Sequence, residues 1–191
     1  RPGAQPLDVE EECGRVLPVI EALAKASKAR LSIDTRNARV MQRAADAGAH
    51  IINDVSALQH DPESLAVAAR IGLPVILMHM QGDPQTMQAK PTYTDVLLDV
   101  TDMLAARVEA CEAAGIARHK IVVDPGIGFG KTLSHNLALL HGLSILHGIG
   151  CPVLLGASRK SFIVRLMVRE VGAEPTDRLP GSLAAALIGA R

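Results

Sequence analysis

The chain has 191 residues, of which 48% are hydrophobic and 21% are charged, and 20 basic side chains balance 20 acidic ones. This composition excludes an intrinsically disordered chain, and the length predicts one domain whose core needs neither disulfides nor a structural metal. Zero net charge, with lysine and arginine scattered along the chain, argues against nucleic acid or an anionic membrane as a partner.

Short apolar runs alternate with longer amphipathic stretches from one end of the chain to the other. Strands are predicted at residues 31–34, 51–55, 74–78, 120–124 and 152–155. They show little polar alternation, which is typical of parallel strands buried on both faces. Helices are predicted at residues 7–27, 37–47, 62–71, 95–114, 134–147, 159–171 and 177–190. The pattern is α/β, and periodicity alone leaves a doubly wound sheet and a (β/α)8 barrel both open.

The three cysteines, Cys13, Cys111 and Cys151, are far apart and show no CxxC spacing. We expect free thiols in a reducing compartment, so the predicted location is cytoplasmic. No apolar run approaches the roughly 18 residues that a membrane span needs, and the first residues lack the layout of a signal peptide. Because the chain begins without methionine and ends within a predicted helix, we expect it to be truncated at both ends.

Polar or sulfur-containing residues stand at the end of every predicted strand: Asp34, Asn53 with Asp54, Met78 with His79, Asp124, and Ser158-Arg159-Lys160. The carboxyl ends of parallel strands face the same way, and that edge is where ligands bind in both α/β architectures. We therefore expect these side chains to converge on one site.

Ordinary structural alternatives exist for several of these residues. Asp34 with Thr35 could cap the following helix, and Asp124 before Pro-Gly could form a turn; each taken singly leaves structure and function equally open. Asn53 interrupts an apolar run, where its amide needs partners that a ligand can supply.

The pair Arg159-Lys160 is predicted to open a helix, at the end where the helix dipole disfavours cations. An anionic or electron-rich ligand would compensate for this unfavourable electrostatic interaction. Alternatively, the charged groups of Arg159 and Lys160 could simply extend into solvent. We favour the ligand.

The glycine-rich segment 124–132 resembles two nucleotide-binding motifs but satisfies neither. Pro125 stands where a Walker A loop needs glycine, and the third glycine comes one residue early for the dinucleotide fingerprint. We therefore predict a flexible substrate loop that carries Phe129. The histidines show no zinc-ligand spacing, and of the two methionines flanking His79 we expect Met78 to line a pocket and Met80 to pack in the core.

In these residues the chain resembles the dihydropteroate synthase family. The matching segments run in family order: Arg1-Pro2-Gly3-Ala4, Ser32-Ile33-Asp34-Thr35, Ile51-Ile52-Asn53-Asp54-Val55, Met78-His79-Met80-Gln81-Gly82-Asp83-Pro84, Met87-Gln88, Asp124-Pro125-Gly126-Ile127-Gly128-Phe129-Gly130-Lys131 and Ser158-Arg159-Lys160-Ser161-Phe162. The resemblance implies an α/β fold of the (β/α)8 TIM-barrel type, with this chain covering about the third to seventh strands and lacking the first, second and eighth. Residues 1–191 would form a single, incomplete pterin-binding barrel domain.

The family activity is a transferase reaction of folate biosynthesis. It condenses 6-hydroxymethyl-7,8-dihydropterin diphosphate with p-aminobenzoate to give 7,8-dihydropteroate and diphosphate, and sulfonamides compete for the p-aminobenzoate site. The resemblance further implies Mg²⁺ as cofactor and a cytoplasmic homodimer. It places no metal ligand in this segment, because the family's metal-binding Asn belongs to the missing first strand.

The resemblance also implies roles for individual residues. The catalytic residues would be Lys160, Asp124 and Arg1. The pterin would be bound by Asp34, Asn53, Met78, Asp124 and Lys160. The p-aminobenzoate or sulfonamide would be bordered by Arg1, Pro2, Phe129, Ser158, Arg159 and Lys160.

Three alternatives stay open at this point. A methyltetrahydrofolate:corrinoid methyltransferase resembles the chain in its Asp, Asn and Asp ligands but has no need of the 158–160 segment or the Phe129 loop. A non-catalytic paralogue would bind pterin without turnover. The chain could also be a structural piece only, and we expect it to fold poorly by itself, because five strands of an eight-stranded barrel leave open edges.

Overall fold

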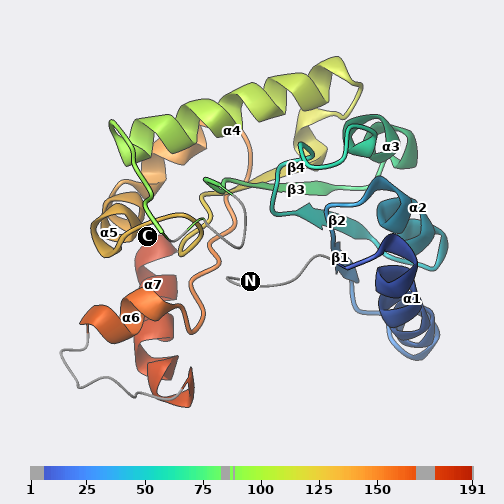
Figure 1. The fold of residues 1–191 in the computed structure, drawn as a ribbon, viewed down its shortest axis with the longest axis horizontal. Coiled ribbons are helices and arrows are strands. Elements are labelled where there is room, and N and C mark those ends of the chain that lie inside the picture. Colours follow the sequence, from blue (N-terminus) through green and yellow to red (C-terminus); the bar gives the residue numbers. More distant parts are fainter. Residues whose placement is uncertain (1–6, 83–86, 88, 167–174, 191) are drawn as a thin grey trace.

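The computed structural model describes residues 7–82, 87, 89–166 and 175–190. Its centre is a parallel sheet with the strand order β1-β2-β3-β4 (Figure 1). The strands are β1 (Ser32–Asp34), β2 (Ile51–Asp54), β3 (Val75–Met78) and β4 (Ile121–Asp124). Each strand pairs with its neighbour in chain order, and all three pairings are parallel, as predicted.

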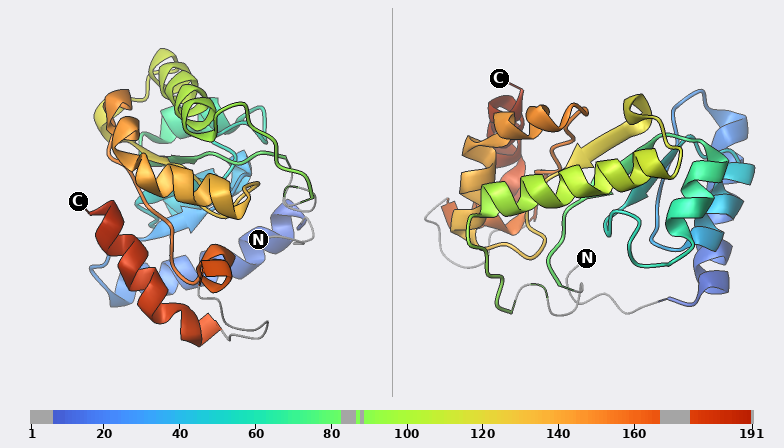
Figure 2. Two further views of the ribbon diagram at one scale, coloured as in Figure 1. Left: turned by 90° about the vertical axis from the view of Figure 1, so that its left-hand side faces the viewer. Right: turned by 90° about the horizontal axis from the view of Figure 1, so that it is seen from above.

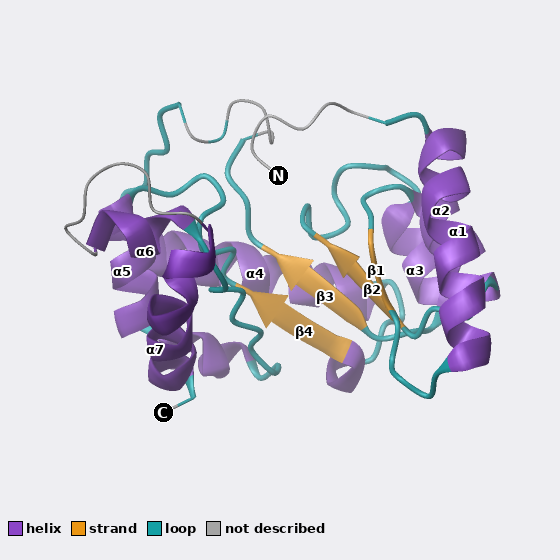
Figure 3. Ribbon diagram, turned by 90° about the horizontal axis from the view of Figure 1, so that it is seen from below, coloured by secondary structure: helices purple, strands orange, loops and turns teal. Residues whose placement is uncertain are grey.

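Helices occur before, between and after the strands, and those between successive strands cover one side of the sheet (Figure 3). They are α1 (Val9–Ala26), α2 (Ala38–Asp46), α3 (Ser64–Ile71), α4 (Val96–Ala113), α5 (Leu133–His141), α6 (Ser161–Leu166) and α7 (Leu179–Gly189), with 3-10 turns η1 (Arg118–Lys120), η2 (Leu143–Ile149) and η3 (Pro175–Arg178). Helices α1, α2 and α3 pack beside one another near β1 and β2, whereas α5, α6 and α7 gather at the opposite end (Figure 1). Helix α4 spans the distance between these two groups (Figure 2).

The two long helices begin at the residues that their sequences favour. The Asp8 carboxylate accepts a hydrogen bond from the Glu10 amide at the start of α1, and Asp95 accepts from the Leu97 and Leu98 amides at the start of α4. Such caps satisfy amide groups that have no partner within the first helical turn. The predicted bounds of these helices therefore differ from the observed ones by at most two residues.

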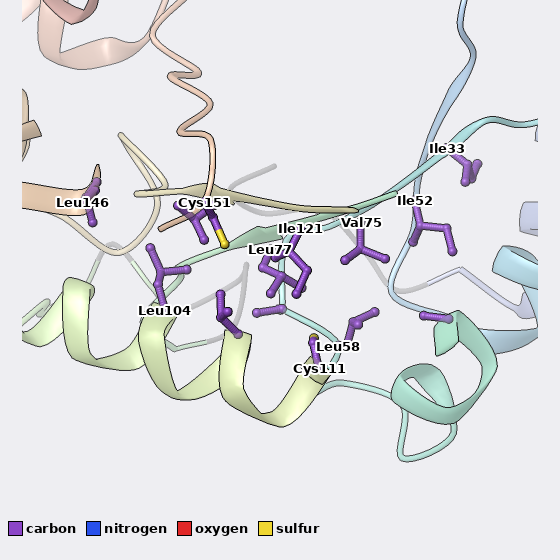
Figure 4. Close-up of a cluster of buried hydrophobic side chains, with 14 of the residues drawn as sticks. Ile33, Ile52, Leu58, Val75, Leu77, Leu104, Cys111, Ile121, Leu146 and Cys151 are labelled. Carbon is purple, nitrogen blue, oxygen red and sulfur yellow. The ribbon is translucent and has the colours of Figure 1, made fainter. Parts of the chain in front are cut away.

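The core lies between the sheet and the helices. Ile33, Ile52, Val75 and Ile121 follow one another across the four strands in register, so their side chains share one face. In Figure 4, Leu104 of α4 reaches toward the strands near Val75 and Ile121, whereas Ile33 lies farther along the sheet, beyond the end of this helix. All five side chains are at most 5% exposed.

The opposite face of the sheet is less buried than the sequence predicted. Ile51, Ile76 and Val122 are only partly buried, whereas burial on both faces was expected. The physical reason is visible in Figure 3, where no described helix lies across the strands on this side. Met78 and Asp124, at the carboxyl ends of β3 and β4 on the same face, are nevertheless buried, at 4% and 7% exposed.

The fifth predicted strand, at residues 152–155, is reduced to a single bridge between Val153 and Val123. The Val123 amide donates to the Pro152 carbonyl at 2.9 Å, and the Leu154 amide donates to the Val123 carbonyl at 2.8 Å. In a parallel ladder the next donors on either side would be the amides of residues 152 and 125. Both are prolines, which have no N–H, so regular pairing stops in both directions.

Three predicted helices differ from the observed ones. The helix expected at 134–147 ends at His141 with Gly142 as its C-cap, and the chain continues as the 3-10 turn η2. The helix expected at 159–171 begins at Ser161 and is described to Leu166, so residues 167–171 lie outside the described part. The first turn of the helix expected at 177–190 is the 3-10 turn η3.

All three cysteines are buried and unpaired, as the sequence predicted. Among the described residues, none of the helices combines the length and the apolar character needed to cross a membrane.

Candidate functional site

The sheet brings four of the predicted ligand-binding residues to one face and one edge. Asp34 pairs in register with Asn53, and Met78 pairs in register with Asp124. Because side chains alternate along a strand, all four lie on the face opposite the α4 core, at the carboxyl ends of their strands. The parallel order of the strands thus collects residues that are 90 positions apart in the sequence.

Asp34 ends β1 and is exposed. Asp34 does not cap α2. The N-cap position of that helix is Asn37, and the first backbone N–H group of the helix, that of Ala38, donates to the Asp61 carboxylate at 2.9 Å. The surrounding protein nevertheless raises the pKa of the Asp34 carboxyl above its ordinary value, mainly by desolvation, and Glu12 adds a like charge. The side chain is therefore available to a ligand rather than used in the fold.

Asn53 and Asp54 are neighbours with opposite orientations. The Asp54 carboxylate is fully buried and accepts hydrogen bonds from the amide and hydroxyl of Ser56, at 2.7 and 2.6 Å, and from the Leu58 amide at 3.1 Å. Burial raises the Asp54 pKa while these hydrogen bonds oppose the rise. The side-chain amide group of Asn53 is half-buried and makes no hydrogen bond to another described residue. Asp54 thus builds the turn, and Asn53 keeps its donors and acceptor for a ligand.

Asp124 is 7% exposed. Its Oδ1 accepts a hydrogen bond from the backbone N–H group of Gly126 at 2.7 Å, so Asp124 does form a turn with the Pro-Gly segment. No other described residue donates to this carboxyl group. Burial raises the pKa of Asp124, whereas the Gly126 hydrogen bond and then the charges of Lys160 and Lys131 oppose the rise. A buried carboxyl group with one committed oxygen can still accept from a ligand N–H group.

Lys160 and Phe129 come from different loops and meet beside Asp124. The Lys160 Nζ lies 4.1 Å from the centroid of the Phe129 ring, within the range of a cation–π contact. Burial lowers the pKa of Lys160, and the negative charge of Asp124 opposes that change. The site therefore combines a cation, an aromatic face and a buried carboxyl group.

Hydrogen bonds join the loop after β4, for which the sequence predicted flexibility, to neighbouring segments. Gly126 has φ +67°, and a side chain there would collide with the His79 carbonyl group. The Gly128 amide donates to the Asn136 side chain at 2.7 Å, and the Tyr93 hydroxyl donates to the Gly130 carbonyl at 2.7 Å. The glycines serve a close backbone approach rather than mobility.

Sequence reasoning assigned no role to Lys131, which is 3% exposed and touches His79 and Phe129. Its Nζ lies 2.9 Å from His79 Nδ1, 3.0 Å from the Phe129 carbonyl oxygen and 3.3 Å from the His79 carbonyl oxygen. Burial lowers the Lys131 pKa to about 7, with Asp124 raising it and Lys160 lowering it. Burial and the Lys131 charge lower the His79 pKa to about 3, so the imidazole is neutral and can accept. The sequence shows only that Lys131 belongs to a glycine-rich segment, and this does not predict which groups its ammonium contacts.

The remaining predicted residues are placed less centrally. Ser158 and Arg159 are exposed, and the Arg159 main chain is held by Ser182 and Arg178 rather than by the sheet. The expectation that Arg159 and Lys160 open a helix is wrong, since Arg159 adopts a left-handed turn (φ +52°) before α6 begins. Arg1 and Pro2 lie outside the described residues.

Within the described ranges, no group of three or more His, Cys, Asp or Glu side chains is placed to hold a metal ion. Hard cations such as Mg²⁺ take about six oxygen ligands, of which the protein often supplies only one or two. The residues described here do not form a metal centre by themselves.

Comparison with known proteins gives one consistent result. The sequence matches the protein family described as "Pterin binding enzyme" over residues 1–191. It is 50% identical to the dihydropteroate synthase of Escherichia coli (strain K12) over 190 residues, covering 100% of this chain and 66% of that protein. The chain therefore spans about two thirds of the length of this curated relative.

Solved structures agree. The Yersinia pestis dihydropteroate synthase in complex with a sulfonamide drug is 48% identical, with a TM-score of 0.94 over 100% of this chain and 67% of that chain. The Xanthomonas albilineans dihydropteroate synthase with 4-aminobenzoic acid is 45% identical, with a TM-score of 0.91 over 100% and 66% of the two chains. These likenesses confirm the predicted α/β fold as part of a TIM barrel.

Proposed function

The chain belongs to the family of pterin-binding enzymes, and from that premise we propose that it is part of a dihydropteroate synthase. The proposed reaction joins 6-hydroxymethyl-7,8-dihydropterin diphosphate to p-aminobenzoate, giving 7,8-dihydropteroate and diphosphate. The observation that carries the proposal is the shared sheet face of Asp34, Asn53, Met78 and Asp124, next to Lys160 and Phe129.

The polar groups of this face suit the edge of a pterin ring. The pterin presents an exocyclic amine and ring N–H groups beside a carbonyl group. Carboxylates at Asp34 and Asp124 and the uncommitted amide of Asn53 accept from these donors, and Lys160 donates to the carbonyl and a ring nitrogen. Met78 packs against the ring face. A site that pairs so many groups discriminates against analogues that lack them.

In the proposed reaction the amine nitrogen of p-aminobenzoate bonds to the methylene carbon of the pterin. The carbon–oxygen bond to diphosphate breaks, its electron pair leaves with diphosphate, and the amine nitrogen loses a proton to solvent. Cleavage before attack would produce a pterin cation, so charge stabilisation is the main catalytic task. Asp124 supplies the nearby negative charge, and its buried position strengthens that interaction.

The p-aminobenzoate site is proposed to border Phe129, Ser158 and Lys160, with Arg159 assisting from the exposed turn. The Xanthomonas and Yersinia structures contain 4-aminobenzoic acid and a sulfonamide drug, respectively, which supports binding of both kinds of ligand by related proteins. The roles of Arg1 at the diphosphate and of Pro2 beside p-aminobenzoate stay predictions, because both residues lie outside the described part of the chain.

Mg²⁺ enters the proposal through the family resemblance alone. It would be held by oxygen atoms of the diphosphate and by a ligand outside this chain, and it would neutralise the leaving group. An incomplete single barrel domain over residues 1–191, a homodimer and a cytoplasmic location likewise stay predictions.

The test measures dihydropteroate formation by the complete gene product that contains this chain, with both substrates and Mg²⁺ present. We expect turnover in the wild type and at least a 100-fold loss of kcat/KM in Lys160→Ala. The control is Lys25→Ala, which removes an exposed lysine from the last turn of α1.

Wild-type protein that binds pterin without turnover would overturn the proposal. Methyl transfer from methyltetrahydrofolate to a corrinoid would then identify the corrinoid methyltransferase. Without that activity, a non-catalytic paralogue would be the better description.

A further inference from the structure

The ammonium group of Lys131 joins the end of one strand to the loop after the next. Three acceptors surround its Nζ: the His79 ring nitrogen, the His79 carbonyl oxygen and the Phe129 carbonyl oxygen. A lysine ammonium has three hydrogens and no acceptor, so each hydrogen has one partner. Residues 79 and 129 are 50 positions apart, and this side chain links them within the buried interior.

Both partners of Lys131 are next to the proposed site. His79 follows Met78, and its amide donates to the Asp124 carbonyl at 2.9 Å, which continues the pairing of β3 with β4. Phe129 presents its ring to the Lys160 ammonium. A shift of the Phe129 main chain would therefore move the aromatic face relative to Lys160 and Asp124.

We propose that Lys131 is a positioning residue of this site, which fixes Phe129 for p-aminobenzoate by binding the carbonyl groups of Phe129 and His79. This inference rests on the proposed function for its substrate. In this proposal Lys131 acts on p-aminobenzoate through Phe129.

The other hydrogen bonds of this loop do not replace the one between Lys131 and the Phe129 carbonyl group. The Tyr93 hydroxyl binds the Gly130 carbonyl, and the Asn136 side chain binds the Gly128 amide, so both hold the residues on either side of Phe129. Among the described residues, the one other hydrogen bond to the Phe129 main chain is that of its N–H group to the Gly126 carbonyl at 3.0 Å, within the same loop. Lys131 is thus the described contact that binds the Phe129 carbonyl to the sheet.

The variant Lys131→Met removes the ammonium group and keeps much of the side-chain volume. The matched control is Lys120→Met, because Lys120 also donates to a main-chain carbonyl, that of Gly72 at 2.7 Å. Lys120 lies just before β4, whereas Lys131 lies beyond its carboxyl end. Both variants lose a lysine-to-carbonyl hydrogen bond, but only one is beside the site.

In the complete gene product, we expect Lys131→Met to raise the KM for p-aminobenzoate about 10-fold or more, with the KM for the pterin diphosphate changed less than 3-fold. Lys120→Met should leave both KM values within 2-fold of the wild type. Equal changes in both KM values, or a KM for p-aminobenzoate that stays at the wild-type level, would overturn the inference.

A second readout does not depend on activity. Amide hydrogen exchange in residues 126–132 should be at least 10-fold faster in Lys131→Met than in the wild type and in Lys120→Met, while β1 to β3 stay protected. Unchanged exchange in this loop would overturn the positioning role. If the wild type shows no synthase turnover, the proposed function fails, whereas the exchange result still decides whether Lys131 holds the loop.

Should Lys131→Met not fold, Lys131→Gln takes its place. Its neutral amide keeps two N–H donors on a shorter side chain. The same separation of the two KM values and the same faster loop exchange are expected, and their absence overturns the inference.

Discussion

The Lys160 ammonium lies 4.1 Å from the centre of the Phe129 ring, although the two residues belong to loops that follow different strands. Phe129 is held in the loop after β4, and Lys160 follows the one-residue bridge at Val153. Asp124 and Lys160 each influence the pKa of the other, so Lys160 links the buried carboxyl group to the aromatic ring.

Phe129→Leu removes the aromatic face and keeps an apolar side chain of moderate size. A cation–π contact contributes about 0.5–2 kcal/mol, so we expect the KM for p-aminobenzoate to rise by about 3- to 30-fold. Steady-state kinetics of the complete gene product measures it. The control is Phe162→Leu, which changes a buried ring of α6 and should reduce stability without changing that KM. An unchanged KM in Phe129→Leu would contradict a role for the ring.

Asp124→Asn keeps the size of the side chain and removes its negative charge. Hydrogen bonds to charged groups contribute about 1.5–3 kcal/mol, so the Kd of the pterin diphosphate should rise by about 10- to 150-fold. Titration calorimetry measures this change in the complete gene product. Asp46→Asn, on the exposed surface of α2, serves as the control for an aspartate change. Pterin binding equal to that of the wild type would remove Asp124 from the site.

Gly126→Ala tests the close approach of the loop to β3. Gly126 and Gly115 both have positive φ, at +67° and +96°, so an added side chain strains both positions. Only at Gly126 would the new carbon collide with a carbonyl group, that of His79; at Gly115 nothing lies within 4 Å. We expect Gly126→Ala to lower the free energy of unfolding by about 2 kcal/mol more than Gly115→Ala. Urea denaturation of the two variants measures the difference, and equal losses would contradict it.

His79→Asn tests how the buried imidazole links stability to pH. Folding lowers the His79 pKa from 6.5 to about 3, so below pH 6.5 the unfolded chain binds more protons than the folded one. The free energy of unfolding therefore falls as the pH falls from 6.5 toward 3. Asparagine places an acceptor near the position of Nδ1 and does not titrate, so the variant lacks this contribution.

Relative to His79→Asn, the wild type should lose about 2 kcal/mol of unfolding free energy between pH 7.5 and pH 5. Urea denaturation at several pH values measures this difference. The control for removal of a histidine is His119→Asn, whose ring is exposed in η1. Parallel pH curves for the wild type and His79→Asn would show that His79 is not buried in its neutral form.

Much of the fold was predictable because its signals are local. The apolar runs that became β1 to β4 and the capping residues Asp8 and Asp95 act within a few positions of the elements that they begin or end. The one-residue bridge at Val153 was not predicted. Its cause is non-local, because Pro125 on one segment and Pro152 on the other lack the N–H groups that would continue the pairing on either side of the bridge.

The residues of the candidate site likewise fall into those that local sequence could select and one that it could not. Asp34, Asn53, Met78 and Asp124 could be selected because polar or flexible side chains interrupt or end apolar runs, and parallel strands place their carboxyl ends together. Lys131 could not be selected, because its three partners come from positions 79 and 129 and nothing in the local sequence indicates that its head is buried.

The sequence by itself determined the strands, the long helices and the residue types at the strand ends, because these depend on periodicity, capping and backbone chemistry. Only the tertiary structure decided which face of the sheet is open, that Asp54 is used in a turn while Asn53 is not, and that Lys131 ties Phe129 to His79. Those outcomes depend on desolvation and on distances between segments far apart in the chain, and neither quantity is set until the strands are in register.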